Sequence, residues 1–202
     1  MEILKKLELK GSQIALLNNH CNLLRFFLVM NPPDIFFMDI LNRIGIPIWK
    51  IYLQENGEDT FLRQAAQNKR PLLVSFPLSR VHKIEKLIEI AHDVGNRKLA
   101  LLYELEENIS QPRGKLWEPL KTLQAKFDVI LGLSDPSSSQ DLLDEALSLG
   151  VRIIEKNLTF NPKAEEPYPK KALDPEGFHR MVESIRQFER ENATHLVKNN
   201  RF

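Results

Sequence analysis

Short apolar runs alternate with amphipathic segments along most of the chain, and this alternation constrains the fold more than any other feature. The runs begin roughly every 20 to 30 residues, which is the length of one strand–helix unit. They occupy residues 26–30, 48–53, 72–76, 99–105, 129–133 and 151–158. Most are apolar at consecutive positions, as strands covered on both faces must be. The pattern predicts an α/β protein with about six strand–helix units.

The segments between these runs carry residues typical of helix ends. Three of the expected helices stop at Gly45, Gly95 and Gly150. Pro33 suits the first turn of one helix, Ser79 can cap another, and Asp174 opens the last one. A further helix is expected at residues 11–24, ahead of the first strand. These signals agree with the strand positions and support the same alternating order.

Alternating units build either an open doubly wound sheet or a closed barrel of eight units. Periodicity does not choose between these two architectures, and only about six units are present. The chain has 202 residues, enough for one domain with its own core. We expect a single barrel-like domain over residues 1–192 and a polar, frayed tail at 193–202.

Composition excludes several classes of protein. The net charge is +1 and the basic residues are dispersed, so no nucleic-acid partner is expected. No apolar run approaches the roughly 20 residues that a membrane span needs, so no membrane partner is expected either. The N-terminus lacks the charged-then-apolar order of a secretory signal, and Cys21 is the single cysteine. These features favour a cytoplasmic protein.

Five stretches of the sequence, in the same order, resemble the sialic acid synthase family (N-acetylneuraminate synthase and its relatives). The first three read Leu-Lys-Lys-Leu-Glu-Leu at 4–9, Gly-Ile-Pro-Ile-Trp-Lys-Ile at 45–51 and Gly-Leu-Ser-Asp at 132–135. The other two lie at 146–159, around the sequence Ile-Ile-Glu-Lys-Asn, and at 170–182. The resemblance extends from about residue 4 to 189 and is strongest near the C-terminal end.

The resemblance implies an incomplete TIM-type (β/α) barrel that holds the family's strands three to eight. It implies that the chain starts after the second strand and ends before the small antifreeze-like domain that many members carry. Members of the family condense phosphoenolpyruvate with an amino sugar and use a divalent metal such as manganese. The resemblance therefore links the chain to nonulosonic acid and surface carbohydrate biosynthesis.

The two positions of the family's metal-binding histidines hold Pro136 and Asn157 here. Proline has no ligand atom, and an amide oxygen is a poor substitute for an imidazole nitrogen. We therefore expect no bound metal or other cofactor. Hydroxyl and small donors of the family's site are replaced by Leu53, Phe76, Glu104 and Glu106.

Residues that keep the family's type are candidates for a vestigial pocket at the C-terminal ends of the strands. They are Lys50, Glu55, Ser75, Ser134, Asp135 and Glu155. Each has a structural alternative. Glu155 is either an acid or base that points inward or a paired structural carboxylate, and Ser134 and Asp135 can simply begin a loop that caps the next helix. Lys50 can extend along apolar surface or pair with a carboxylate.

Three functions remain open at this point. The chain is a synthase relative without condensing activity, a pseudoenzyme that binds a sugar, a protein or another copy of itself. Alternatively, it is a fragment that works with a separate chain supplying the first two strands. As a third possibility, Glu104, Glu106 and Glu107 serve a different enzyme whose substrate is an amine or cation. Open sheet edges need covering, so we expect a homodimer, a partner chain or the N-terminal helix there.

Overall fold

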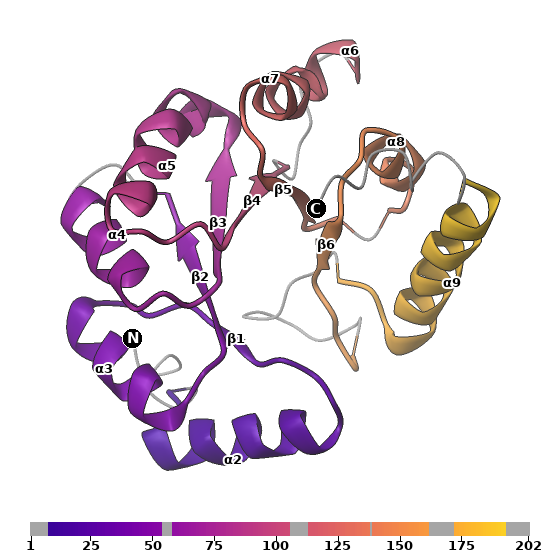
Figure 1. The fold of residues 1–202 in the computed structure, drawn as a ribbon. Coiled ribbons are helices and arrows are strands. Elements are labelled where there is room, and N and C mark those ends of the chain that lie inside the picture. Colours follow the sequence, from indigo (N-terminus) through magenta and orange to yellow (C-terminus); the bar gives the residue numbers. More distant parts are fainter. Residues whose placement is uncertain (1–7, 54–57, 106–112, 138, 162–171, 193–202) are drawn as a thin grey trace. The chain divides into compact units, whose positions relative to one another are not determined.

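A computed structural model describes residues 8–53, 58–105, 113–137, 139–161 and 172–192 of the protein. Within these residues six strands form one sheet in the order of the chain, β1 to β6 (Figure 1). They are β1 (Val29–Met30), β2 (Ile48–Tyr52), β3 (Leu72–Pro77), β4 (Leu99–Glu104), β5 (Ile130–Asp135) and β6 (Ile153–Lys156). The pairs β1–β2, β2–β3 and β5–β6 are parallel. The predicted six strands are confirmed, although β1 is shorter than expected.

The strand order decides between the two architectures that periodicity left open. Each strand neighbours the next one in the chain, with no reversal of direction along the sheet. A doubly wound sheet has a point where the strand order reverses, whereas a (β/α) barrel adds its strands consecutively. The topology is therefore that of a barrel.

Helices connect the strands, as the alternating pattern predicted. The described α-helices are α2 (Gly11–Leu23), α3 (Ile35–Ile44), α4 (Glu58–Gln67), α5 (Ile84–Asp93), α6 (Arg113–Leu116), α7 (Glu118–Lys126), α8 (Leu143–Ser148) and α9 (Pro175–Glu191). A 3-10 helix, η1 (Leu78–Lys83), precedes α5. Of these helices, none combines the length and the apolar content that a membrane crossing requires. The tail predicted at 193–202 lies outside the described residues.

Two of the predicted helix starts are wrong. Pro33 does not lie in the first turn of α3 but precedes the cap, Asp34, whose carboxylate accepts a hydrogen bond of 2.7 Å from the Phe37 amide. Ser79 lies inside η1, and α5 begins after Lys83 without a side-chain cap. The start at Asp174 is confirmed, since its carboxylate accepts from the Gly177 amide at 2.7 Å.

The predicted glycine stops are confirmed, and all three share one backbone geometry. Gly45, Gly95 and Gly150 have φ angles of 84°, 72° and 81°, in the left-handed region. The amide after each glycine bonds back to the helix, as Ile46 does to the Leu41 carbonyl at 3.0 Å. This is the Schellman arrangement, which satisfies carbonyls that the helix end would leave open.

Helix α2 ends with the same geometry but without a glycine. Arg25 has a φ of 60°, and the Phe26 amide donates to the Cys21 carbonyl at 2.8 Å. A left-handed conformation costs a residue with a Cβ atom about 1 kcal/mol or more. This arrangement turns the chain between α2 and the connection to β1. The sequence did not predict it, because no glycine stands at this helix end.

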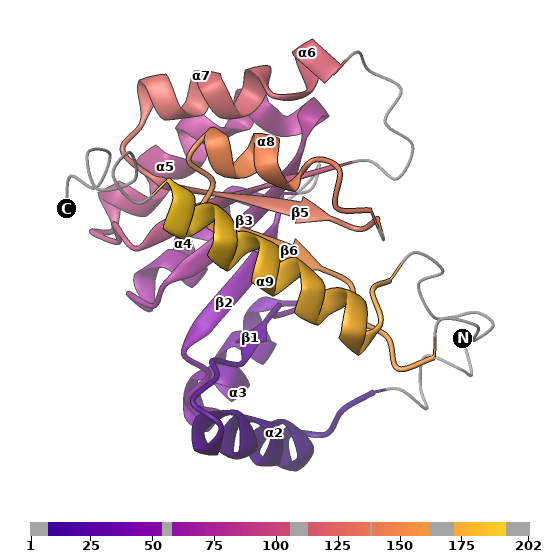
Figure 2. The same cartoon turned by 90° about the vertical axis from the view of Figure 1, so that its right-hand side faces the viewer.

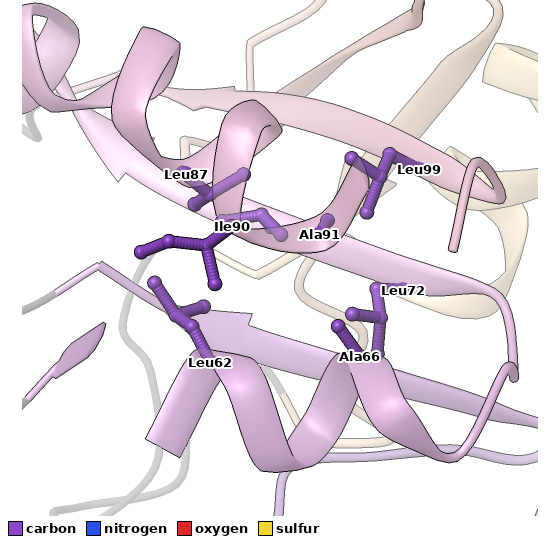
Figure 3. A pocket seen from close by; sticks show the side chains of 8 residues that line it. Leu62, Ala66, Leu72, Leu87, Ile90, Ala91 and Leu99 are labelled. Atoms are coloured by element: carbon purple, nitrogen blue, oxygen red, sulfur yellow. The ribbon is translucent and has the colours of Figure 1, made fainter. Parts of the chain in front are cut away.

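The chain divides into two compact units, and each is described separately. The first comprises residues 1–75 and 82–100, and the second residues 76–81 and 101–202. In the first unit, α4 and α5 pack against each other and against β3. Figure 3 shows Leu62 of α4 pointing toward Ile90 of α5 across a small apolar gap, with Leu72 of β3 among its lining residues. The prediction of a single domain over residues 1–192 stays a prediction.

A polar network ties the turns before β2, β3 and β4 together in the first unit. Asn96 is buried and donates to the carbonyls of Ala66 and Arg70 at 3.1 and 2.9 Å. The Arg70 guanidinium donates to the Asn42 side chain at 2.9 Å and to the Ile46 carbonyl at 2.8 Å. These bonds satisfy backbone groups that helices and strands leave open, so they position the N-terminal ends of the strands.

In the second unit, α8 and α9 lie against each other (Figure 2). Their shared core contains Leu143, Leu147, Leu173 and Met181, and Ile154 of β6 packs against it. The buried Trp117, just before α7, donates its indole N–H to the Glu145 carboxylate at 2.6 Å. The second unit therefore has its own core of helix and strand residues.

The glycine stops predict a difference between two glycine-to-alanine substitutions. Gly45→Ala adds a Cβ atom in open space, but at a φ of 84°, so only the backbone conformation opposes it. We expect it to lower the free energy of unfolding by about 1 kcal/mol. Gly11→Ala, in the first turn of α2, meets Ile40 at an ordinary contact distance of 3.9 Å. It should be neutral or slightly stabilising. Urea denaturation of both variants measures the difference, and equal effects would contradict the capping role of Gly45.

Candidate functional site

In the second unit, the pairing of β5 with β6 determines which side chains share a face of the sheet. Ser134 lies opposite Glu155, and Asp135 lies opposite Lys156. Ile154 packs against the core of α8 and α9. Because side chains alternate along a strand, Lys156 and Asp135 share the helix-facing side with Ile154, whereas Ser134 and Glu155 lie on the opposite face.

Ser134 and Glu155 form a direct pair on that opposite face. The Ser134 hydroxyl donates to a Glu155 carboxylate oxygen at 2.7 Å, and both residues are half-buried. The structure therefore brings together two of the six residues predicted for the vestigial pocket. Of the two interpretations of Glu155, the paired structural carboxylate has a partner in the structure. Its role as an acid or base stays a prediction.

Asp135 forms a second pair, an ion pair with Lys156, on the helix-facing side. Its carboxylate contacts the Lys156 ammonium at 2.5 Å, and the two side chains are only 7% and 3% exposed. Its other oxygen accepts from the Ser137 amide at 2.9 Å, and the Lys156 ammonium also donates to the carbonyls of Ser137 and Ser139. Asp135 is thus the last residue of β5 and holds the loop that follows, but it does not cap the next helix, because α8 begins after Leu142 without a side-chain cap.

Lys156 was missed among the candidate residues, although the sequence carried a signal. It stands in a run that the sequence predicts to be a covered strand, and a lysine is almost never fully buried without a partner. The family-like Asp135 is the acidic residue that alternation places on the same side of the neighbouring strand. Pairing Lys156 with Asp135 requires the register between β5 and β6, and a single sequence does not specify that register.

Among the described residues, no side chains compensate for the loss of imidazole at the two positions that correspond to the family's metal-binding histidines. Pro136 is half-buried in the loop that Lys156 holds, and Asn157 is exposed just after β6. The Asn157 carbonyl accepts from the Leu173 amide at 2.9 Å, which places its backbone in a bridge leading to α9. In the described part of the chain, no three His, Cys, Asp or Glu side chains converge in a way that could hold a metal. These residues do not fit the divalent metal that the family resemblance implies.

Lys50 and Ser75 lie in the first unit, on adjacent strands β2 and β3. Leu72 and Val74 of β3 line the apolar gap beside α4 and α5, so Ser75 faces the other way. Tyr52 is paired with Ser75, and the Lys50 ammonium stands 4.5 Å from the Tyr52 ring centre. Lys50 is 7% exposed and Ser75 is fully buried. This group offers a positive charge stabilised by an aromatic ring.

The remaining sequence candidates divide into core residues and residues outside the described ranges. Leu53 and Phe76, expected to replace donors of the site, are buried core side chains. The Phe76 ring contacts the Tyr103 ring at 5.7 Å between centres. Glu104 is half-buried at the end of β4. Glu55, Glu106 and Glu107 lie outside the described residues, so the acidic cluster stays a prediction.

The chain matches the model of the NeuB family over residues 1–195, and it belongs to that family. A relative is the pseudaminic acid synthase of Campylobacter jejuni, 29% identical over 152 residues, covering 75% of this chain and 44% of that protein. The predicted resemblance to sialic acid synthases is therefore confirmed. The chain spans about half the length of the curated relatives it matches, for example 56% of one and 44% of another.

Solved structures show the same fold. The spore coat polysaccharide biosynthesis protein SpsE of Bacillus subtilis superposes with a TM-score of 0.81 at 20% identity, covering 94% of this chain and 53% of that one. The N-acetylneuraminic acid synthetase of Leptospira borgpetersenii, solved with citrate, gives a TM-score of 0.79 at 19% identity, covering 96% and 73%. At these sequence identities the structural similarity establishes a shared fold and nothing about function. It confirms the incomplete TIM-type barrel.

The buried pair of Lys156 and Asp135 predicts a strong effect of removing one partner. Lys156→Met leaves the Asp135 carboxylate buried without its counter-ion and frees the carbonyls of Ser137 and Ser139. We expect the free energy of unfolding to fall by about 3 to 5 kcal/mol. Urea denaturation followed by circular dichroism measures the loss.

A double-mutant cycle provides the control for this prediction. In the Lys156→Met and Asp135→Leu double variant no charge is left unpaired, so a large part of the stability should return. Arg180→Met removes an exposed ion pair with Glu176 on α9 and should cost less than about 1 kcal/mol. Additive losses in the Lys156 and Asp135 cycle would contradict the coupling of the two charges.

Proposed function

We propose that this chain is a NeuB-family protein of surface carbohydrate biosynthesis that does not itself condense phosphoenolpyruvate with an amino sugar. It acts instead as a binding or interaction module on the inherited barrel. The link to carbohydrate biosynthesis comes from the family, in which the relatives include a pseudaminic acid synthase and a spore coat polysaccharide biosynthesis protein. The absence of condensing activity is inferred from the chemistry of this chain's own residues.

One observation carries the proposal: the polar residues that survive at the ends of β5 and β6 bind one another. Ser134 bonds to Glu155, and Asp135 is held by Lys156 on the opposite face of the sheet. A carboxylate that faces the helices and is neutralised by an ammonium is not available to a ligand on the other face. With Pro136 and Asn157 nearby, the residues that the structure describes in this region supply neither imidazole nor a converging set of carboxylates. Divalent ions of the manganese type bind to such ligands.

The group around Lys50 supports a binding role in the first unit. A buried ammonium beside an aromatic ring, with a buried serine opposite that aromatic residue on the next strand, suits a ligand with carboxylate or hydroxyl groups, such as a sugar acid. We therefore propose a sugar or sugar acid as the ligand class for this face. The cytoplasmic location predicted from the sequence remains part of the proposal.

Metal and substrate titrations test the loss of condensing activity. We expect isothermal titration calorimetry to show no tight binding of manganese. Incubation with phosphoenolpyruvate, manganese and a panel of amino sugars should release no inorganic phosphate above background. The physical reason is the replacement of two imidazole ligands by a proline and an exposed amide. Manganese binding together with turnover would refute the proposal.

Two controls make the result specific. An active member of the family, assayed in the same buffer, shows that the conditions support condensation. The double variant Pro136→His and Asn157→His restores the two family ligands, and we expect it to bind manganese more tightly than the natural sequence. If the natural chain became active only when mixed with a separate chain carrying further strand–helix units, the fragment hypothesis would replace this one.

A further inference from the structure

Tyr52 brings an aromatic ring to the same face of β2 as the buried Lys50. Because side chains alternate along a strand, Lys50 and Tyr52 leave β2 on the same side. The Lys50 ammonium lies 4.5 Å from the centre of the Tyr52 ring, which is within the range of a cation–π contact. Lys50 is 7% exposed and Tyr52 is 40% exposed. The ring is therefore the outer member of this pair, and the positive charge is the inner one.

The sheet fixes the place of Tyr52 on this face. Tyr52 is the last residue of β2 and is paired with Ser75 of β3. The amide of the following residue, Leu53, donates to the Ser75 carbonyl at 2.9 Å. Leu53 is itself a buried core side chain. The backbone around Tyr52 is thus held by its neighbour strand, so the position of the ring does not depend on a loop.

The neighbouring strand also limits where the Tyr52 ring can turn. Paired residues of adjacent strands point to the same face, so Ser75 shares this face with Tyr52. Ser75 is fully buried. A turn of the ring toward β3 would displace this buried side chain. The position over the Lys50 ammonium is therefore the one that the packing favours.

The pair lies where a barrel receives its ligands. Lys50 and Tyr52 belong to the last three positions of β2, and sites in (β/α) barrels lie at the C-terminal ends of the strands. A ligand that approaches this end of β2 meets the ring before it meets the ammonium. The ring can therefore decide which anions reach the charge.

An aromatic ring discriminates between anions by their charge and their shape. The face of the ring is negative and its edge is positive. A phosphoryl group is tetrahedral and carries close to two negative charges at neutral pH, so the ring face repels it about twice as strongly as it repels a carboxylate. A carboxylate is planar and can approach the ammonium along the positive edge of the ring. The weakly positive C–H groups of a sugar can lie against the ring face.

We propose that Tyr52 determines the ligand selectivity of the Lys50 face, because its ring shields the Lys50 ammonium from phosphoryl groups while it admits the carboxylate of a sugar acid. This inference rests on the binding role proposed above for Lys50, and it adds the residue that discriminates between ligands. Tyr52 is not among the six residues that the sequence predicted for the vestigial pocket.

Isothermal titration calorimetry on the full chain tests the role of Tyr52, with inorganic phosphate and N-acetylneuraminate as the two probes. Tyr52→Ala removes the ring and uncovers the ammonium. We expect the dissociation constant for phosphate to fall by at least roughly 10-fold, in line with the size of a cation–π contact. The dissociation constant for N-acetylneuraminate should not fall, because its carboxylate already reaches the ammonium in the natural chain.

Three control variants make the result specific. Tyr52→Phe keeps the ring and should bind both probes as the natural chain does. Phe26→Ala removes an aromatic side chain that is 64% exposed and precedes β1, away from the C-terminal ends of the strands, and should also change neither affinity. In the Tyr52→Ala background, Lys50→Met should abolish the gain in phosphate binding, because the gain comes from the uncovered ammonium.

Circular dichroism shows whether each variant keeps its helix content. Tyr52→Thr, with a β-branched side chain that suits a strand, gives the same comparison if the alanine variant does not fold. Equal phosphate affinity with and without the ring would overturn the inference, and so would a gain that survives Lys50→Met. If the natural chain bound no N-acetylneuraminate, the ligand class under the proposed function would fail, whereas the change in phosphate affinity would still decide the role of Tyr52.

Discussion

The structure depends on one constraint: each parallel strand must be followed by a helix that returns the chain to the starting edge of the next strand. Because the strands follow one another in chain order, every return places the C-terminal strand ends on the same side of the sheet. The helices cover one face with Leu, Ile, Val and aromatic side chains. Polar residues at the strand ends are then divided by alternation between that covered face and the opposite one. The positions of Ser134, Asp135 and Glu155 all follow from this division.

The division separates family-like residues that are neighbours in the sequence. Ser134 and Asp135 are adjacent in sequence, yet they face opposite sides of β5. On one side Glu155 accepts a hydrogen bond from Ser134, and on the other Lys156 neutralises Asp135 within a largely dry core. A buried charge persists only with such a partner, since desolvation opposes it. The pair therefore holds the loop after β5 in place.

The first unit has two further features outside its apolar core. Lys50, Tyr52 and Ser75 gather on the face away from the helices, where a ligand of this fold would be expected. At the edge, α2 shows its leucines to the outside and buries an asparagine.

The sequence by itself determined the class of fold and the positions of its elements. Apolar runs located the strands, because a covered parallel strand must be apolar on both faces, and Gly45, Gly95 and Gly150 located helix ends, because the left-handed turn favours a residue without a side chain. The end of α2 at Arg25 could not be predicted in this way, because Arg25 adopts the left-handed conformation although it is not a glycine. The starts at Pro33 and Ser79 were wrong, because several residues near a helix start can cap it and tertiary packing selects among them.

Tertiary structure alone decided which candidates meet. Strand register joined Lys156 to Asp135 and Ser134 to Glu155, and no pattern within one segment encodes register. It also decided that the apolar side of α2 faces outward, because the side of a helix that becomes buried depends on which neighbours are present to cover it.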